Sequence, residues 1–168
     1  MEFEICTLHL PMTIKLLVLG KTDSAQLTQL IEEYQNRLKH YIKFELEIIP
    51  DIKNTKNLSE KQQKEKEGEA ILNKLNPTDR LVLLDENGKQ KTSVEFSGYL
   101  QKNMNSGLKQ LVFVIGGPYG FSEAVYQKSQ GKISLSKMTF SHQMVRLFMV
   151  EQLYRAFTIL RNEPYHHH

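Results

Sequence analysis

The stretch FVIGGPYGFSEAVY, from Phe113 to Tyr126, carries the clearest structural signal in this chain. An apolar run ends abruptly in Gly-Gly-Pro-Tyr-Gly at residues 116–120, and a helix is expected to begin at Ser122. A strand, a tight turn and a helix in this order are typical of a parallel α/β sheet. Glycines between a strand and a helix often cradle a phosphate group, so the known phosphate-binding motifs provide the first test.

Neither phosphate motif fits this stretch. A P-loop places its second glycine five residues after the first, but Phe121 occupies that position after Gly116. A dinucleotide fingerprint requires glycine where the chain has Pro118. The sequence also lacks a Gly-x-Ser-x-Gly elbow and any cluster with metal-ligand spacing, so we expect no metal site. Taken alone, the stretch favours a plain turn that glycine permits and proline presets.

The sequence around this stretch alternates strands with helices. Apolar or alternating runs predict strands at residues 14–20, 43–50, 80–89, 110–117 and 132–136. Helical spacing and capping residues predict a helix after each strand, the last of them from Ser141 to about Asn162. This order predicts the α/β class, as a three-layer sandwich around a mostly parallel sheet.

Two local features of this pattern carry separate expectations. The third strand is expected to end in an Asp-Glu-Asn-Gly turn at residues 85–88. The helix capped by Ser59 and Gln62 opens with EKQQKEKEGE, residues 60–69. Because this opening is so polar, we expect the first half of the helix to lie in solvent, and its glutamates weaken any case for RNA binding there.

Composition suits one soluble domain. The chain has 168 residues, of which 40% are hydrophobic and 24% charged, and no apolar run approaches the length of a membrane span. Cys6 is the only cysteine, so no disulfide forms within the chain and a cytoplasmic location is the default. The formal net charge of +3 permits a polyanionic partner such as RNA without requiring one.

The first eleven residues, MEFEICTLHLP, fit poorly with the rest of the chain. They contain no Lys or Arg and so lack the charged start of a secretory signal. Met12 then opens MTIKLLVLGK, which reads as the start of a domain spanning residues 12–168. We therefore interpret residues 1–11 as an upstream extension or an artificial addition, and assign no chemistry to Cys6 or His9.

The last predicted helix is too apolar for the surface of a monomer. Eleven of the sixteen residues from Val145 to Leu160 are apolar. A surface helix carries one apolar stripe, so this helix should be buried on more than one face. In a chain this short a homodimer partner is the natural cover, and a central core helix within one protomer is the alternative.

Several segments of the chain together resemble those of a known family. FVIGGPYGFSEAVY is followed, from Ile133, by ISLSKMTFSHQMVRLFMVEQLYRAFTILRNEPYHH, and EKEGEAIL and LVLLDENGK precede it. In this order and spacing, these segments resemble the ribosomal RNA large-subunit methyltransferase H family, one of the SPOUT methyltransferases. The resemblance covers residues 12–168. It leaves nothing over for a separate RNA-binding domain.

The resemblance implies both fold and activity. It implies a sheet that ends in a deep trefoil knot, which periodicity alone does not predict because knots are almost absent from proteins. It also implies a homodimer that uses S-adenosylmethionine to methylate N3 of a pseudouridine in helix 69 of 23S rRNA. The partner is then rRNA in the large subunit or the whole ribosome, and neither DNA nor a membrane.

Two other functions stay open at this point. One is a SPOUT methyltransferase acting on another RNA such as tRNA, which the short length and missing RNA-binding appendage disfavour. The other is a non-catalytic ribosome-binding protein that has kept the fold. A flavodoxin-like nucleotide binder is weakened by the absence of a phosphate loop.

The resemblance also assigns the cofactor pocket. Its three segments lie at the carboxyl ends of predicted strands, where open α/β sheets bind ligands. Leu84 is otherwise plain core, and Met138 and Phe140 are otherwise loop anchors. The implied cofactor-binding residues are Leu84, Gly116, Leu135, Ser136, Lys137, Met138, Thr139 and Phe140.

Catalysis requires a group that accepts the proton of N3. Histidine suits this role because its ordinary pKa is near 6.5. His142 follows the cofactor loop and is one candidate, although it can also serve only to start the helix. His166 in the tail is the other candidate. The closing histidines can also be a tag remnant, but the resemblance continues through Pro164-Tyr165-His166, which favours a native tail.

Two arginines of the last helix need partners. Arg155 has Glu151 one helical turn earlier as a structural partner, or it holds RNA phosphate or orients the target base. Arg146 allows the same two interpretations, without an obvious local partner. We place Arg155 and Tyr165 in the site beside the two histidines.

Overall fold

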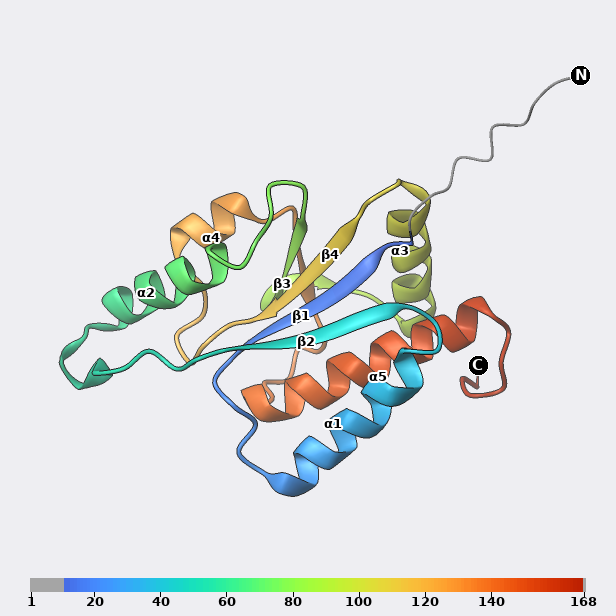
Figure 1. Ribbon diagram of the computed structural model, residues 1–168, viewed down its shortest axis with the longest axis horizontal. Helices are drawn as coiled ribbons and strands as arrows, with labels where there is room; N and C mark the ends of the chain where they lie inside the picture. The colour runs from blue at the N-terminus through green and yellow to red at the C-terminus, as the bar shows by residue number, and fades with distance from the viewer. Residues whose placement is uncertain (1–10, 168) are drawn as a thin grey trace, which may run out of the picture.

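A computed structural model describes residues 11–167 of the chain. The predictions for Cys6, His9 and His168 lie outside the described residues. All five strands lie in one parallel sheet of order β2-β1-β4-β3-β5 (Figure 1), which confirms the predicted α/β fold. The strands are β1 (Thr13–Leu19), β2 (Lys43–Ile49), β3 (Arg80–Gln90), β4 (Gln110–Ile115) and β5 (Gly131–Ser134).

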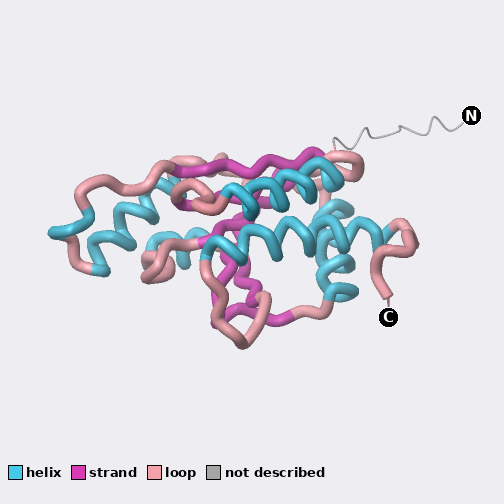
Figure 2. The backbone as a smooth tube through the Cα atoms, turned by 90° about the horizontal axis from the view of Figure 1, so that it is seen from below, coloured by secondary structure: helices cyan, strands magenta, loops and turns pink. Residues whose placement is uncertain are grey.

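Helices cover both faces of the sheet, as the three-layer prediction requires. One hydrophobic core packs α1, α3 and α5 against the sheet, and a second core packs α2 and α4 against the other face. In both views α2 lies at one end of the molecule and the C-terminal tail at the other (Figures 1 and 2). The helices are α1 (Ala25–Leu38), α2 (Glu60–Leu72), α3 (Ser93–Asn105), α4 (Glu123–Lys128) and α5 (His142–Leu160), with a short 3₁₀ turn, η1 (Thr55–Asn57), before α2.

The capping residues start the helices as predicted. Ser59 and Thr92 each form a complete capping box, with Gln62 and Glu95 respectively. Ser141 accepts a hydrogen bond from the backbone N–H of Met144, so α5 begins at His142. The opening of α2 is exposed as expected, although Glu67 and Gly68 near its end are buried.

The apolar helix α5 is largely a core helix within one chain. It packs between α1 and α3 against the sheet, and Met149, Val150 and Leu153 are fully buried there. Burial on several faces is therefore confirmed without a second chain. Met144 near the start of the helix is nonetheless 38% exposed.

The predicted end of the third strand is wrong. β3 continues to Gln90, and the Asp-Glu-Asn-Gly segment forms a bulge inside it. Ile133 of β5 pairs with both Leu84 and Lys89, on either side of the bulge. The backbone N–H of Asn87 donates to Oδ1 of Asp85 at 2.8 Å, which closes the bulge locally and lets the strand resume. Gly88 is required because a Cβ there would lie 2.6 Å from the Ile133 backbone.

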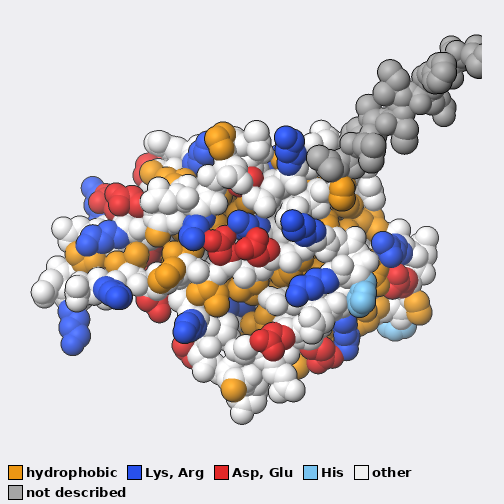
Figure 3. Space-filling view, viewed as in Figure 1, with side chains coloured by type: hydrophobic (Ala, Val, Ile, Leu, Met, Phe, Trp, Pro, Cys, Tyr) orange, Lys and Arg blue, Asp and Glu red, His pale blue; other side chains and the backbone are white. Residues whose placement is uncertain are grey.

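The surface of the face shown in Figure 3 carries mixed charge. Lys and Arg side chains lie interspersed with acidic ones rather than in one patch. Lys15 and Lys74, for example, both pair with Glu47, at 3.0 and 2.9 Å. Among residues 11–167, no helix combines the length and apolar character needed to cross a membrane.

Candidate active site

A cavity of about 450 Å³ lies beside the bulge of β3 and at the carboxyl ends of β4 and β5. Parallel strands bring their carboxyl ends to one edge of the sheet, where ligands of such folds bind. Leu84 of β3, Gly116 after β4 and Leu135 after β5 all line this cavity. Three segments far apart in sequence therefore meet at one place.

The cavity gathers most of the predicted cofactor-binding residues. Seven of the eight line it, and His142 lines it as well. Lys137 is not among the lining residues. The seven are Leu84, Gly116, Leu135, Ser136, Met138, Thr139 and Phe140.

Local hydrogen bonds shape the loop between β5 and α5. The hydroxyl of Ser134 donates to the carbonyl of Ser136, whose own hydroxyl accepts from the N–H of Met138, both at 2.9 Å. The ring of Phe140 packs on Phe148 of α5, with centroids 5.0 Å apart. Met138 is left 74% exposed, so the loop has an anchored start and end and an exposed apolar tip.

The glycine stretch forms another wall of the cavity. Gly117 and Gly120 pair as an isolated antiparallel bridge, and Gly120 adopts a φ of +82° that favours glycine. A Cβ at Gly116 would lie 3.1 Å from the ring of Phe121, so a side chain there would crowd the aromatic group behind the wall. The stretch therefore folds back on itself as a compact wall.

An acidic wall was missed by the sequence reasoning. Asp85 and Glu86 of the β3 bulge line the cavity together with Tyr126 of α4. The Tyr126 hydroxyl donates to Asp85 at 2.5 Å, and burial followed by this hydrogen bond raises the pKa of Tyr126 to about 12. The available signal was the position of Asp85 directly after the buried run of β3, at the same edge as Gly116.

Arg146 has a structural role in the interior of the protein. Its side chain is 2% exposed, and its guanidinium donates to the carbonyls of Leu19 and Gly20 and to the hydroxyl of Thr22. Burial lowers its pKa, against the attraction of Asp23 and Asp51. These partners lie more than a hundred residues away in sequence, which is why no local partner was visible.

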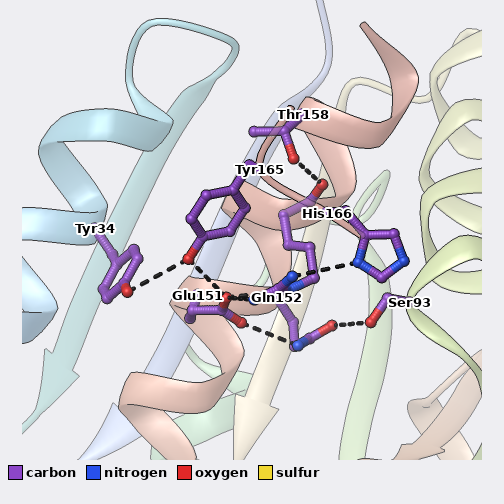
Figure 4. A network of polar contacts seen from close by, with 8 residues as sticks. Tyr34, Ser93, Glu151, Gln152, Thr158, Tyr165 and His166 are labelled. Carbon is purple, nitrogen blue, oxygen red and sulfur yellow. Dashed lines mark hydrogen bonds and ion pairs between the residues drawn. The ribbon is translucent and has the colours of Figure 1, made fainter. Parts of the chain in front are cut away.

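The remaining predicted residues form a separate polar cluster on α5 and the tail (Figure 4). Glu151 accepts hydrogen bonds from Arg155 Nε at 3.1 Å and from the Tyr165 hydroxyl at 2.9 Å. Nδ1 of His166 lies 3.3 Å from Arg155 Nη1. The Arg155 guanidinium also stacks over the Tyr165 ring, 4.7 Å from its centroid. The structure thus brings Arg155, Tyr165 and His166 together.

The electrostatics of this cluster favour an ionised Arg155–Glu151 pair. The hydrogen bond from Arg155 to Glu151 raises the pKa of the guanidinium, against desolvation. Burial, followed by the hydrogen bonds with Tyr34 and Glu151, raises the pKa of the Tyr165 hydroxyl. A guanidinium only donates, so in this contact Nδ1 of His166 is the acceptor.

The cluster and the cavity lie apart within one chain. His142 and Arg155 are separated by thirteen residues of α5, or about 20 Å along a helix. Arg155, Tyr165 and His166 do not line the cavity that His142 lines. The predicted catalytic residues therefore fall into two groups.

A second cavity of about 370 Å³ lies between the two groups. It shares the segment Ile133–Ser136 and Phe140 with the first cavity. Ser93 and Gln152 line it and are bonded to each other at 2.9 Å. Gln152 also donates to Glu151 at 3.0 Å, so the polar cluster reaches the wall of this cavity.

Comparison with known proteins identifies the family. The family model described as "Predicted SPOUT methyltransferase" matches residues 12–166, nearly all of the described chain.

The chain belongs to the SPOUT methyltransferases.

Several curated relatives match this SPOUT methyltransferase over almost their whole length. "Ribosomal RNA large subunit methyltransferase H" of Flavobacterium johnsoniae is 73% identical over 156 residues, which cover 93% of this chain and 99% of the relative. The proteins of the same name from Christiangramia forsetii and Parabacteroides distasonis are 70% and 67% identical, with the same coverage. This chain is a methyltransferase of that enzyme class.

A solved structure supports the fold alone. A probable methylase family protein from Haemophilus influenzae Rd KW20 superposes with a TM-score of 0.51 at 11% sequence identity. The match covers 89% of this chain and 66% of the Haemophilus chain, so this chain spans about two thirds of that structure. The trefoil knot at the C-terminal end of the sheet is implied by membership of the SPOUT family.

Proposed function

We propose that this SPOUT methyltransferase transfers a methyl group from S-adenosylmethionine to N3 of a pseudouridine in helix 69 of 23S rRNA. The names of its relatives support the ribosomal RNA of the large subunit as its substrate. The observation that carries the proposal is the cavity itself, in which seven position-matched residues meet beside the bulge of β3 and at the carboxyl ends of β4 and β5. The target atom and the stem-loop rest on the family resemblance.

The residues at the cavity fit S-adenosylmethionine. Adenine requires apolar walls, which Leu84, Ile115 and Leu135 supply. The sulfonium is a cation, and the carboxylates Asp85 and Glu86 line the same cavity. In this proposal Leu84, Gly116 and residues 135–140, with Lys137 among them, hold the cofactor, which supplies an electrophilic methyl group.

The protein's part in methyl transfer is alignment and proton removal. Holding N3 in line with the methyl carbon contributes several kcal/mol by orientation alone. The N3 proton must also leave, and His142 is the histidine that lines the cavity. We assign proton acceptance to His142, because Nδ1 of His166 already faces Arg155.

Arg155, Tyr165 and His166 then act from the partner subunit of a homodimer. Arg155 near the end of α5, and Tyr165 and His166 in the tail, do not line the cavity of their own chain. Exposed apolar side chains stand around the start of α5, where a partner would cover them: Met138 is 74%, Phe140 37% and Met144 38% exposed. In this arrangement residues 12–168 form one cytoplasmic domain, and residues 1–11 precede it as an extension.

Mass spectrometry of 23S rRNA tests the function. Ribosomes from a strain lacking the gene should gain one methyl group on a helix 69 pseudouridine when protein and S-adenosylmethionine are added. Methylation of tRNA instead would establish another RNA substrate. Failure to bind S-adenosylmethionine at millimolar concentration would favour a non-catalytic ribosome-binding protein.

A further inference from the structure

Glu67 is the buried acidic residue of α2, a helix whose other glutamates are exposed. Its side chain is 7% exposed, whereas Glu60, Glu65 and Glu69 of α2 are exposed. Oε1 of Glu67 accepts a hydrogen bond from Gln63 at 3.0 Å. Oε2 is buried and has no hydrogen-bond partner among the described residues. A buried carboxylate oxygen without a partner is costly, so its position requires a reason.

The carboxylate of Glu67 stands directly against the glycine wall. A Cβ at Gly117 would lie 2.4 Å from Oε2 and 2.7 Å from Oε1, closer than any real Cβ contact. The next residue of α2, Gly68, also packs closely against this segment. A Cβ at Gly68 would lie 2.3 Å from the hydroxyl of Ser122. Ser122 caps α4. Two consecutive residues of α2 therefore rest on both ends of the segment 117–122.

The wall that Glu67 supports separates two cavities. Gly116, Gly117 and Pro118 line the proposed cofactor cavity on one side. The same three residues, with Glu67, line a third cavity of about 360 Å³ on the other. Glu67 is thus placed behind the wall and out of reach of the cofactor.

We infer that Glu67 is a positioning residue that holds the Gly116–Pro118 wall in its cofactor-binding position. This inference rests on the proposed function. Oε2 is an acceptor that stands against the backbone of Gly117, and in the Gly116–Pro118 segment only the two glycines carry a backbone N–H that can donate. A hydrogen bond from this segment to Oε2 would fix the wall and remove the unpaired acceptor. Support of this kind changes cofactor affinity without entering the chemistry.

Isosteric substitution tests the inference. Glu67→Gln keeps the shape but replaces an acceptor oxygen with an NH₂ donor. We expect its Kd and KM for S-adenosylmethionine to rise about tenfold, equivalent to about 1.4 kcal/mol, with kcat at saturating cofactor within about twofold of wild type. The matched control is Glu69→Gln, an exposed carboxylate on the same helix, which should bind as wild type does. Wild-type affinity in Glu67→Gln would overturn the inference.

A paired substitution separates positioning from stability. Gly117→Ala should lower the melting temperature, because its methyl group meets the Glu67 carboxylate. Adding Glu67→Ala removes that clash and should restore the melting temperature while cofactor affinity stays weak. Restored affinity in the double variant would also overturn the inference. If wild-type protein binds no S-adenosylmethionine, the proposed function fails instead, so the two failures are distinguishable.

Discussion

At the residue scale, Gly116 has a different reason to be glycine than the sequence suggested. The family resemblance placed Gly116 in the cofactor pocket, where a missing side chain leaves room for a ligand to approach the backbone. In the structure, the nearest atoms to an added Cβ belong to the ring of Phe121, at 3.1 Å. Gly116 nevertheless lines the cavity, so a larger side chain would clash either with the Phe121 ring or with a bound cofactor.

Gly116→Val is therefore expected to weaken binding of S-adenosylmethionine by at least about tenfold, or about 1.4 kcal/mol. Its two methyl groups either displace Phe121 or enter the cavity, and both distort the wall. Calorimetric titration measures the affinity, and circular dichroism checks that the fold is intact. Gly98→Ala is the control, because nothing lies within 4 Å of a Cβ there. Unchanged binding in Gly116→Val would mean that the turn has no role in the pocket.

Sequence reasoning found residues whose position follows a strand and missed residues that arrive from elsewhere. Leu84, Gly116 and Leu135 were placed at strand ends and do meet at one cavity. Glu67 was interpreted as part of a solvated helix because its neighbours are charged, and helical periodicity does not show that it docks on Gly117. The partners of Arg146 could not be predicted for the same reason, because they are backbone carbonyls of the distant residues 19 and 20.

At the element scale, capping chemistry was readable from sequence and the bulge was not. A capping box depends on two residues three apart, so Thr92 and Glu95 suffice to start α3. The bulge in β3 depends on β5, more than forty residues later, pairing on both sides of it. Asp-Glu-Asn-Gly is a sound turn signal, and only the tertiary pairing turns it into a bulge.

The contact between this bulge and α4 predicts a pH dependence. The pKa of Tyr126 is raised from 10.0 to about 12, so the neutral phenol stabilises the folded state. This contribution is complete below about pH 10 and is lost as the pH rises through about 12. Tyr126→Phe should lower the free energy of unfolding by about 1 kcal/mol at pH 8, and the gap to wild type should close as the pH approaches 12.

Urea unfolding from pH 8 to pH 11.5 measures this gap. Tyr119→Phe is the matched control, because Tyr119 is 44% exposed and has no hydrogen bond to Asp85. A gap that stays constant across the range would show that the pKa of Tyr126 is not raised in the folded protein.

Removal of the C-terminal tail is expected to reduce methylation while leaving cofactor binding nearly unchanged. Deleting residues 164–168 removes Tyr165 and His166 from the Arg155–Glu151 cluster and leaves every lining residue of the cofactor cavity in place. Cofactor affinity should stay within about twofold of wild type, while the methylation rate falls by at least about a hundredfold. Radiolabelled methyl transfer to ribosomes measures the rate. A substitution in exposed Lys61 is the control, and full turnover by the shortened chain would exclude a role for the tail.

At the scale of the whole molecule, the two groups of predicted residues pose a geometric problem. The carboxyl end of the sheet holds the cavity and His142, and α5 runs from there toward the tail at the other end of the molecule (Figure 1). One chain does not bring Arg155, Tyr165 and His166 to its own cavity. In a two-fold dimer whose α5 helices run antiparallel, the tail of one chain lies beside the cavity of the other.

Mixing two impaired variants, assayed at a limiting concentration of S-adenosylmethionine, distinguishes a shared site from a self-contained one. Gly116→Val keeps the tail but damages the cavity, whereas the chain shortened at residue 163 keeps the cavity but lacks the tail. Coexpressed with distinct tags, they form heterodimers in which the cavity of the shortened chain meets an intact tail. Random pairing makes about half of the dimers heterodimers, and each heterodimer has one complete site out of two. The mixture should therefore recover about a quarter of wild-type activity. Purified heterodimers should then reach about half of wild-type activity, whereas a site built within one chain predicts no recovery, since each chain carries its own defect.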